Sequence, residues 1–158
     1  MTSRLSSAIN SLEPLLGTWS VKISVPNMPD FFGRIVFEPI VNGSFVLMKT
    51  VIEGDGPPDS ICMFGGDQDE RFFQMLYSDE RGTSRVYSCV FNGRRWEMWR
   101  RTDDNSQRFR GLISDDGDII DACWENSADG LDWQVDFDMR FERQAETADG
   151  REQLASGA

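Results

Sequence analysis

Four dipeptides of one kind, Asn-Gly or Asp-Gly, divide this chain of 158 residues. They are Asn42-Gly43, Asn92-Gly93, Asp116-Gly117 and Asp129-Gly130, and each lies between runs rich in β-branched and aromatic residues. Such dipeptides are the strongest short-range signal for a β-hairpin, because a type I′ turn needs positive φ at both central residues. A two-residue turn also sets which side chains face one another. We therefore expect an antiparallel sheet whose two faces can be assigned from its turns.

Short runs of alternating apolar and polar residues recur along the chain, separated by Gly, Asp, Asn and Pro. This even spacing is typical of an antiparallel barrel or sandwich, and no predicted helix is long enough to connect parallel strands. The expected fold is all-β, a roughly ten-stranded antiparallel barrel that forms a single domain over residues 1–143. The predicted strands are 18–25, 34–41, 44–53, 59–66, 70–78, 84–91, 94–102, 107–114, 118–126 and 131–143.

The segments outside these strands carry different signals. Apolar residues at helical spacing predict a short amphipathic helix over 5–16, broken near Pro14. Residues 26–33 are expected to be a loop with room for one helical turn. Residues 144–158 are small and polar and are expected to be a flexible tail. A cone of curved sheet around helices is the alternative fold, but it needs more helix than residues 5–16 provide.

The turns assign partners across the hairpins. A two-residue loop at Asp116-Gly117 places Ile113 opposite Ile120, Gly111 opposite Ala122 and Phe109 opposite Trp124. A similar loop at Asp129-Gly130 places Trp124 opposite Val135 and Ile120 opposite Met139. Both registers put the same residues on the apolar face, and the polar face then holds Asp121, Asp136 and Asp138.

The Asn92-Gly93 turn makes a less regular hairpin. It places Cys89 opposite Trp96 and Tyr87 opposite Met98 on one apolar face. The same face ends with Arg85 directly opposite Arg100, which is unfavourable unless something negative lies between them.

Charge and composition limit the partners. The net charge is −11 and the pI about 4.4, so nucleic acid and anionic membranes are not expected as partners. No stretch is apolar enough to span a membrane, and the first twenty residues lack a secretion signal. The three cysteines fit reduced, buried thiols in the cytoplasm rather than a disulfide framework.

The chain contains no histidine. This excludes Ser-His-Asp and Cys-His catalysis and histidine-ligated zinc or haem. The acidic clusters at 67–70, 103–105 and 115–118 do not match a calcium-binding loop and are expected to be solvated turns. Neither a metal nor a cofactor is therefore expected.

Several stretches resemble a known superfamily. The start Gly17-Thr18-Trp19, the ten-strand meander and the final Arg140-Phe141-Glu142-Arg143 are similar to calycins, which include lipocalins and fatty-acid-binding proteins. A group of uncharacterised lipocalin-like bacterial proteins is more similar, through segments 73–79, 84–87 and 107–111, Asp132-Trp133 and Asp136-Phe137. The resemblance implies a barrel whose lumen takes a small apolar ligand. The haem-binding branch uses a proximal histidine that this chain lacks.

Two arginines could bind the polar end of such a ligand. Arg85 and Arg100 suit a carboxylate or phosphate, because a guanidinium binds these groups with two parallel hydrogen bonds. The alternative is that they pair with internal carboxylates or lie in water at the rim. The other candidate ligand-binding residues are Tyr77, Tyr87, Trp96, Met75 and Trp124.

Trp19 and Arg143 are expected to have a structural role. Trp19 begins the first strand and Arg143 ends the last, and these strands are neighbours in a closed barrel. We expect Arg143 to stack on Trp19 and close one end.

The leading functional hypothesis is a cytoplasmic lipocalin-like protein that holds a small, partly apolar ligand, for which the arginines favour an anionic group. One alternative is an enzyme that uses the same cavity, with an inward-facing carboxylate or tyrosine as acid-base group. Another is a filled barrel that acts as a homodimer through an outer face with Val86, Val90 and Trp99.

Overall fold

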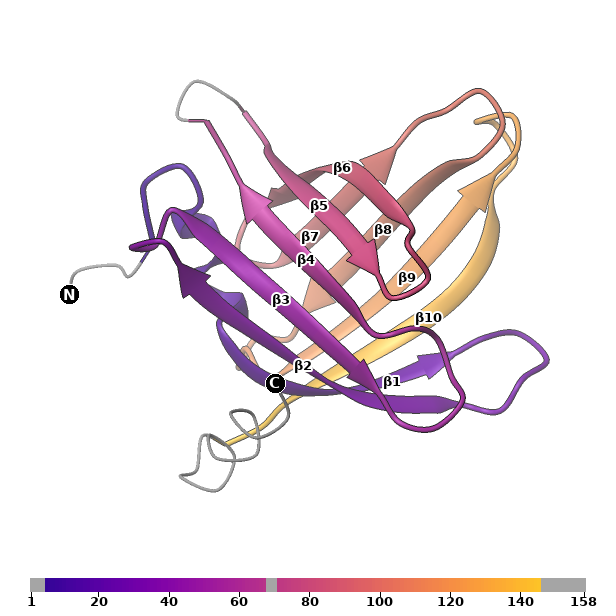
Figure 1. Ribbon diagram of the computed structural model, residues 1–158, viewed down its shortest axis with the longest axis horizontal. Coiled ribbons are helices and arrows are strands. Elements are labelled where there is room, and N and C mark those ends of the chain that lie inside the picture. The colour runs from indigo at the N-terminus through magenta and orange to yellow at the C-terminus, as the bar shows by residue number, and fades with distance from the viewer. Residues whose placement is uncertain (1–4, 68–70, 146–158) are drawn as a thin grey trace.

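The computed structural model describes residues 5–67 and 71–145 and has ten antiparallel strands in one closed barrel (Figure 1). Each strand pairs with its neighbours in sequence, and β1 pairs with β10 to close the barrel. The elements are a 3₁₀ helix η1 (Asn10–Leu15), β1 (Gly17–Ser24), β2 (Phe31–Ile40), β3 (Phe45–Ile52), β4 (Ser60–Gly65), β5 (Phe73–Asp79), β6 (Ser84–Phe91), β7 (Arg95–Arg100), β8 (Ser106–Ile113), β9 (Ile119–Ser127) and β10 (Gln134–Arg143).

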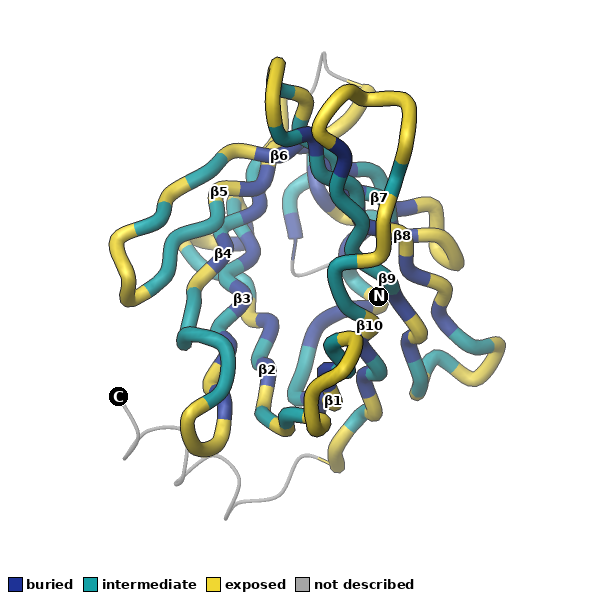
Figure 2. Tube along the Cα trace, turned by 90° about the vertical axis from the view of Figure 1, so that its right-hand side faces the viewer, coloured by how far each residue is buried: buried dark blue, intermediate teal, exposed yellow. Residues whose placement is uncertain are grey.

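The predicted fold class and all ten strands are confirmed. Buried and exposed residues alternate along the strands (Figure 2). The buried side chains are mostly apolar. Large aromatic side chains fill the centre of the barrel. Trp96 lies between Phe37, Phe109 and Phe141, at ring-centroid distances of 5.9, 4.6 and 5.9 Å. The centre of the barrel is therefore packed core rather than open lumen.

The turns differ from the predicted type I′ geometry in three of the four hairpins. At Asn92-Gly93, Asp116-Gly117 and Asp129-Gly130 only the glycine has positive φ. The first turn does use left-handed backbone, with φ of 50° at Val41, 57° at Asn42 and 79° at Gly43. Its loop has four residues, because Ile40 pairs with Phe45.

The register of the Asp116-Gly117 hairpin is confirmed, since Phe109 pairs with Trp124 and Ile113 with Ile120. The other two predicted registers were wrong by two residues. Phe91 pairs with Trp96 across the β6–β7 turn, and Phe141 rather than Met139 pairs with Ile120. A two-residue shift leaves every side chain on its predicted face, because the side-chain period of a strand is two.

The start of β10 departs from the predicted face. A β-bulge between Val135 and Phe137 inserts one residue into the ladder, which reverses the alternation. Val135 is therefore exposed, and Trp133 lies before the strand with the Arg108 guanidinium 4.1 Å from its ring centroid. The prediction had placed Val135 on the apolar face, opposite Trp124.

The N-terminal segment is not the amphipathic α-helix that was predicted over residues 5–16. Only the six residues of η1 are helical, and the helix is 3₁₀ with Pro14 inside it. Proline lacks an N–H and clashes with the preceding turn, which limits a helix to a short piece. The apolar residues of the segment are nevertheless buried: Leu5, Ile9, Leu12, Leu15 and Leu16.

The segment closes one end of the barrel. The backbone N–H of Ser6 donates to the carbonyl of Gly43 in the β2–β3 turn, at 2.8 Å. In Figure 1, η1 lies beside this turn at the left end of the barrel.

The other end, here called the mouth, is surrounded by loops 25–30, 53–59, 80–83, 101–105 and 128–133. Loop 25–30 contains no helix, so this loop does not form a helical lid over the mouth.

At the closed end, Arg143 connects the last strand to the N-terminal segment and to the β8–β9 turn. Its guanidinium lies 4.2 Å from the Trp19 ring centroid and donates to the carbonyls of Pro14, Leu16 and Gly117. Gly17 makes room for it, because a Cβ at this position would lie 3.2 Å from Arg143 Nη1. The φ of Gly17 is also +117°, a value that other residues rarely adopt.

Candidate functional site

The mouth of the barrel holds most of the predicted ligand-binding residues. Alternation along β5 to β8 points Tyr77, Arg85, Tyr87, Arg100 and Gln107 inward, and all but Tyr87 remain partly exposed. Because water still reaches these inward-facing side chains, the interior is not fully packed at this end.

A hydrogen-bonded triad connects β6 with β8. Gln107 Oε1 accepts from Tyr87 Oη at 2.8 Å and from Arg85 Nη1 at 3.1 Å. Burial raises the pKa of Tyr87, although the neighbouring guanidiniums of Arg85 and Arg100 oppose the shift. The phenol is therefore a neutral donor at physiological pH.

Arg100 has no such partner. It ends β7 beside Gln107, with which it is paired across the β7–β8 ladder. Its guanidinium makes no hydrogen bond or ion pair with any residue in 5–67 or 71–145. A half-buried guanidinium carries five N–H donors, and leaving such donors unpaired costs free energy.

The predicted pairing of Arg85 with Arg100 was wrong, because of the two-residue shift in the β6–β7 register. Arg85 lies above the last β6–β7 pair, and Gln107 brings the two arginines into one cluster instead. Neither arginine pairs with a carboxylate in the described part of the chain, which was one of the two alternatives expected for them. Both are partly exposed near the mouth, which agrees with the other alternative, a position at the rim in water.

Tyr77 lies at the rim, and its hydroxyl already makes a hydrogen bond within the protein. It donates to Asp79 Oδ2 at 2.7 Å, and the same carboxylate accepts from Arg81 Nη2 at 2.8 Å. The Asp79 side chain is completely covered, and its ion pair with Arg81 holds its pKa well below the usual range. This network orders the β5–β6 turn at the edge of the mouth.

Trp124 forms the aromatic wall of the mouth. Its ring lies 5.4 Å from Tyr87, 5.2 Å from Phe109 and 6.5 Å from Phe137, and both Trp124 and Phe137 are only partly buried. An apolar part of a ligand can pack here, next to the guanidiniums.

Two predicted ligand-binding residues lie deeper. Met75 and Trp96 are each 1% exposed and belong to the packed core. The indole N–H of Trp96 has no hydrogen-bond partner among the described residues. These side chains support the mouth from below.

Sequence reasoning missed Gln107 as a site residue. Its position follows only from the β7–β8 register, and loop 101–105 has no short turn that would have given this register. Asn126 pairs with Gln107 and faces inward by the same alternation, but it makes no hydrogen bond with Arg85 or Tyr87 and is not part of the triad.

The carboxylates of the last hairpin were predicted to face outward. Asp121 and Asp138 are exposed, as expected. Asp136 lies at the β10 bulge and is half-buried, which raises its pKa. It makes no hydrogen bond with the described residues, so no positioned acid-base pair is present there.

The cysteines are free thiols. Cys62 and Cys89 are buried, and burial raises the pKa of each to about 12, whereas Cys123 is partly exposed. Within residues 5–67 and 71–145, no three Cys, Asp or Glu side chains gather as a metal site would require. No helix in those ranges has the length and apolar character needed to cross a membrane.

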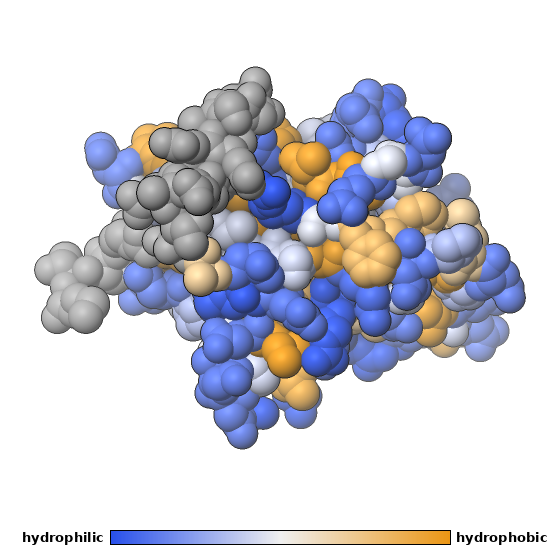
Figure 3. Space-filling model, turned by 90° about the horizontal axis from the view of Figure 1, so that it is seen from below, coloured by the Kyte–Doolittle hydropathy of each residue, from blue (hydrophilic) through white to orange (hydrophobic). Residues whose placement is uncertain are grey.

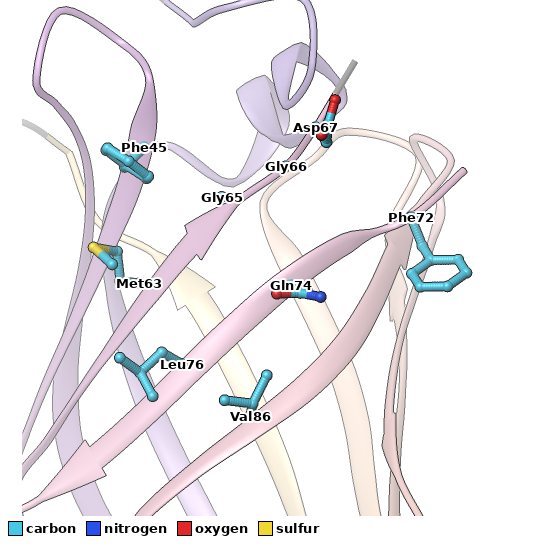
Figure 4. A pocket seen from close by; sticks show the side chains of 9 residues that line it. All are labelled: Phe45, Met63, Gly65, Gly66, Asp67, Phe72, Gln74, Leu76 and Val86. Carbon is cyan, nitrogen blue, oxygen red and sulfur yellow. The ribbon is translucent and has the colours of Figure 1, made fainter. Parts of the chain in front are cut away.

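A cavity lies on the outer wall over β4, β5 and β6. Its volume is about 750 Å³, and Met63, Leu76 and Val86 line it as neighbours on adjacent strands (Figure 4). The outward-facing residues of these strands carry no charge. This uncharged wall consists of Ile61, Met63, Gln74, Leu76, Ser78, Ser84, Val86 and Ser88.

Trp99 also faces outward, as predicted, and packs against Phe72 at 5.7 Å between ring centroids. The view from below shows a different kind of surface, on which hydrophilic residues surround small groups of apolar ones (Figure 3).

Comparison with solved structures supports the barrel. The crystal structure of Rv2717c from M. tuberculosis matches with a TM-score of 0.64 at 17% identity, covering 89% of this chain and 99% of that one. A DUF3598-family protein of unknown function from Nostoc punctiforme matches at 8% identity with a TM-score of 0.29, over 89% of this chain and all of that one. No protein-family model and no curated protein matches the sequence. The likeness to Rv2717c shows a shared fold.

Proposed function

We propose that this protein is a lipocalin-like binding protein of the calycin type, which holds a small, partly apolar anion in the mouth of its barrel. The observation that carries the proposal is Arg100, a half-buried guanidinium whose donors no described residue satisfies. A carboxylate, sulfonate or phosphate would accept from it in the bidentate manner that guanidinium favours.

The surroundings of Arg100 support an anion with an apolar body. Arg85 adds a second positive charge, and Tyr87 adds a neutral hydroxyl. Trp124 and Phe137 offer aromatic surface at the same end of the barrel. Ligand sites of this kind combine a mostly apolar lining with a few convergent polar groups.

Native mass spectrometry of gently purified protein, followed by extraction and identification of the bound molecule, tests the proposal. We expect a small acid at a ratio of one per chain, and we expect Arg100→Ala to lose it. Arg95→Ala is the matched control, because Arg95 lies on the same strand but is exposed at the closed end. A chain free of small molecules in every preparation would contradict the proposal.

The uncharged wall favours a second candidate, a homodimer that acts through this outer face. Two copies that each carry a net charge of −11 repel one another, and a surface without charges is where they can meet at least cost. A second copy seated here would cover Leu76 and Val86, which are 39% and 54% exposed.

Sedimentation velocity in the analytical ultracentrifuge tests whether the protein is this homodimer. The homodimer predicts that the wild type sediments as a dimer and Leu76→Lys as a monomer. Leu112→Lys, an equally apolar exposed position on β8, is expected to leave the dimer intact. A monomeric wild type at micromolar concentration would eliminate the homodimer.

A further inference from the structure

The barrel wall is weakest between β6 and β7. Only four residue pairs connect these strands, from Ser88–Trp99 to Phe91–Trp96, and each of the other nine ladders has at least five. The first four residues of β6, Ser84 to Tyr87, pair with β5 but not with β7. Because β7 ends at Arg100, one residue beyond the last pair, the first half of β6 has no ladder partner on this side, and we call this gap the β6–β7 split.

A cavity of about 470 Å³ lies at the split. Tyr87 and Arg100, which line it, face the barrel interior, whereas Val86 and Trp99 face the outside. Successive side chains of a strand point to opposite faces, so a cavity that borders residues of both sets lies beside the edge where the β6–β7 pairing ends. The cavity therefore borders Arg100 from the side of the barrel rather than from the mouth.

A side-chain bridge spans the inner side of the split. Gln107 reaches from β8 past the end of β7 to Tyr87 and Arg85 on β6. This bridge consists of two hydrogen bonds to one amide oxygen, so it can open without disturbing a backbone ladder.

Charge distinguishes the split from the mouth as a route for an anion. The five loops around the mouth contain nine acidic residues and two basic ones. The lining of the split contains no carboxylate and two arginines, Arg100 and Arg101, the second of which is also one of the two basic residues of the loops. Like charges at a rim slow the approach of an anion, and opposite charges accelerate it.

We propose that the β6–β7 split is the entrance through which the anionic ligand reaches Arg100, with Gln107 as its latch. This inference rests on the proposed binding function. The split gives direct access to the one unpartnered guanidinium that faces the barrel interior among the described residues, and the ligand avoids the acidic rim.

Stopped-flow binding of 8-anilinonaphthalene-1-sulfonate, an aromatic sulfonate, tests the route. Val86→Cys places a thiol at the outer edge of the split, and Val51→Cys places one on the outer face of β3, where the side chain is 49% exposed compared with 54% for Val86. Both variants are made in a Cys123→Ser background, because the other two cysteines are buried. Each is compared before and after attachment of a maleimide that carries a polyethylene glycol chain.

We expect the attached polymer to slow association and dissociation about tenfold or more at position 86, and to leave both rates unchanged at position 51. The Kd should stay constant, because an obstacle in the passage slows both directions equally. Equal association rates for the two labelled proteins would contradict the proposal that the split is the entrance, and would leave the proposed binding function intact. A sulfonate that does not bind even to unlabelled protein would overturn both.

Gln107→Ala provides an independent test of the latch. Without the shared acceptor, the split opens more readily, and we expect the association rate to rise several-fold. Asn126→Ala is the matched control, since Asn126 also faces inward but makes no hydrogen bond with Tyr87 or Arg85. An unchanged association rate in Gln107→Ala would show that Gln107 is not the latch.

Discussion

At the scale of single residues, Val41 has the least favourable backbone in the described chain. Its φ is +50°, although it is β-branched, and its side chain is 63% exposed, so little burial compensates. Asparagine tolerates this left-handed region far better. We predict that Val41→Asn raises the free energy of unfolding by about 1 kcal/mol, measured by urea denaturation.

Val51→Asn is the control for this prediction. Val51 is exposed to a similar degree but lies in an extended strand, where asparagine is disfavoured. Its free energy of unfolding should fall. A decrease in both variants would show that strain at Val41 is not the determining factor.

The covered carboxylate of Asp79 makes stability depend on pH. Its pKa is lowered in the folded state, so the ionised form stabilises the fold above the unfolded pKa, about 3.9, and this contribution disappears as the pH falls. Asp79→Asn should therefore be less stable than the wild type at pH 7. The difference, measured by urea denaturation between pH 3 and 8, should shrink below about pH 4. A difference that is constant across this range would contradict the assignment.

At the scale of elements, Arg143 connects the last strand to η1 and to the β8–β9 turn. Its removal leaves the carbonyls of Pro14, Leu16 and Gly117 without this donor and exposes one face of Trp19. We predict that Arg143→Ala lowers the free energy of unfolding by about 2–3 kcal/mol. Amide exchange of residues 5–16 should accelerate in parallel.

Arg143→Lys separates charge from geometry. A lysine keeps the positive charge but lacks the planar fork that reaches three carbonyls. The free energy of unfolding of Arg143→Lys should therefore fall nearly as far as that of Arg143→Ala. Full rescue by lysine would mean that charge alone holds the closed end.

The same elements show where sequence reasoning succeeds. Alternation and turn residues gave the ten strands and their inward faces, since burial of one face determines alternation. The registers at Asn92-Gly93 and Asp129-Gly130 failed because their loops are longer than two residues. The β10 bulge could not be foreseen, because its extra residue, Asp136, leaves no sign in the pattern.

At the scale of the whole molecule, the barrel has a closed, packed end and a mouth lined by partly exposed polar side chains. The sequence was sufficient to nominate Arg85, Tyr87 and Arg100, because all three alternate with core residues. Their true arrangement depends on Gln107 and on the early end of the β6–β7 ladder. Both are consequences of long-range register, which local patterns do not encode.

Equilibrium titration with 8-anilinonaphthalene-1-sulfonate tests most directly that Arg100 is an anion site. The account predicts saturable one-to-one binding to the wild type, a Kd about tenfold or more weaker for Arg100→Ala, and wild-type affinity for Arg95→Ala. Equal affinity of the wild type and Arg100→Ala would contradict it.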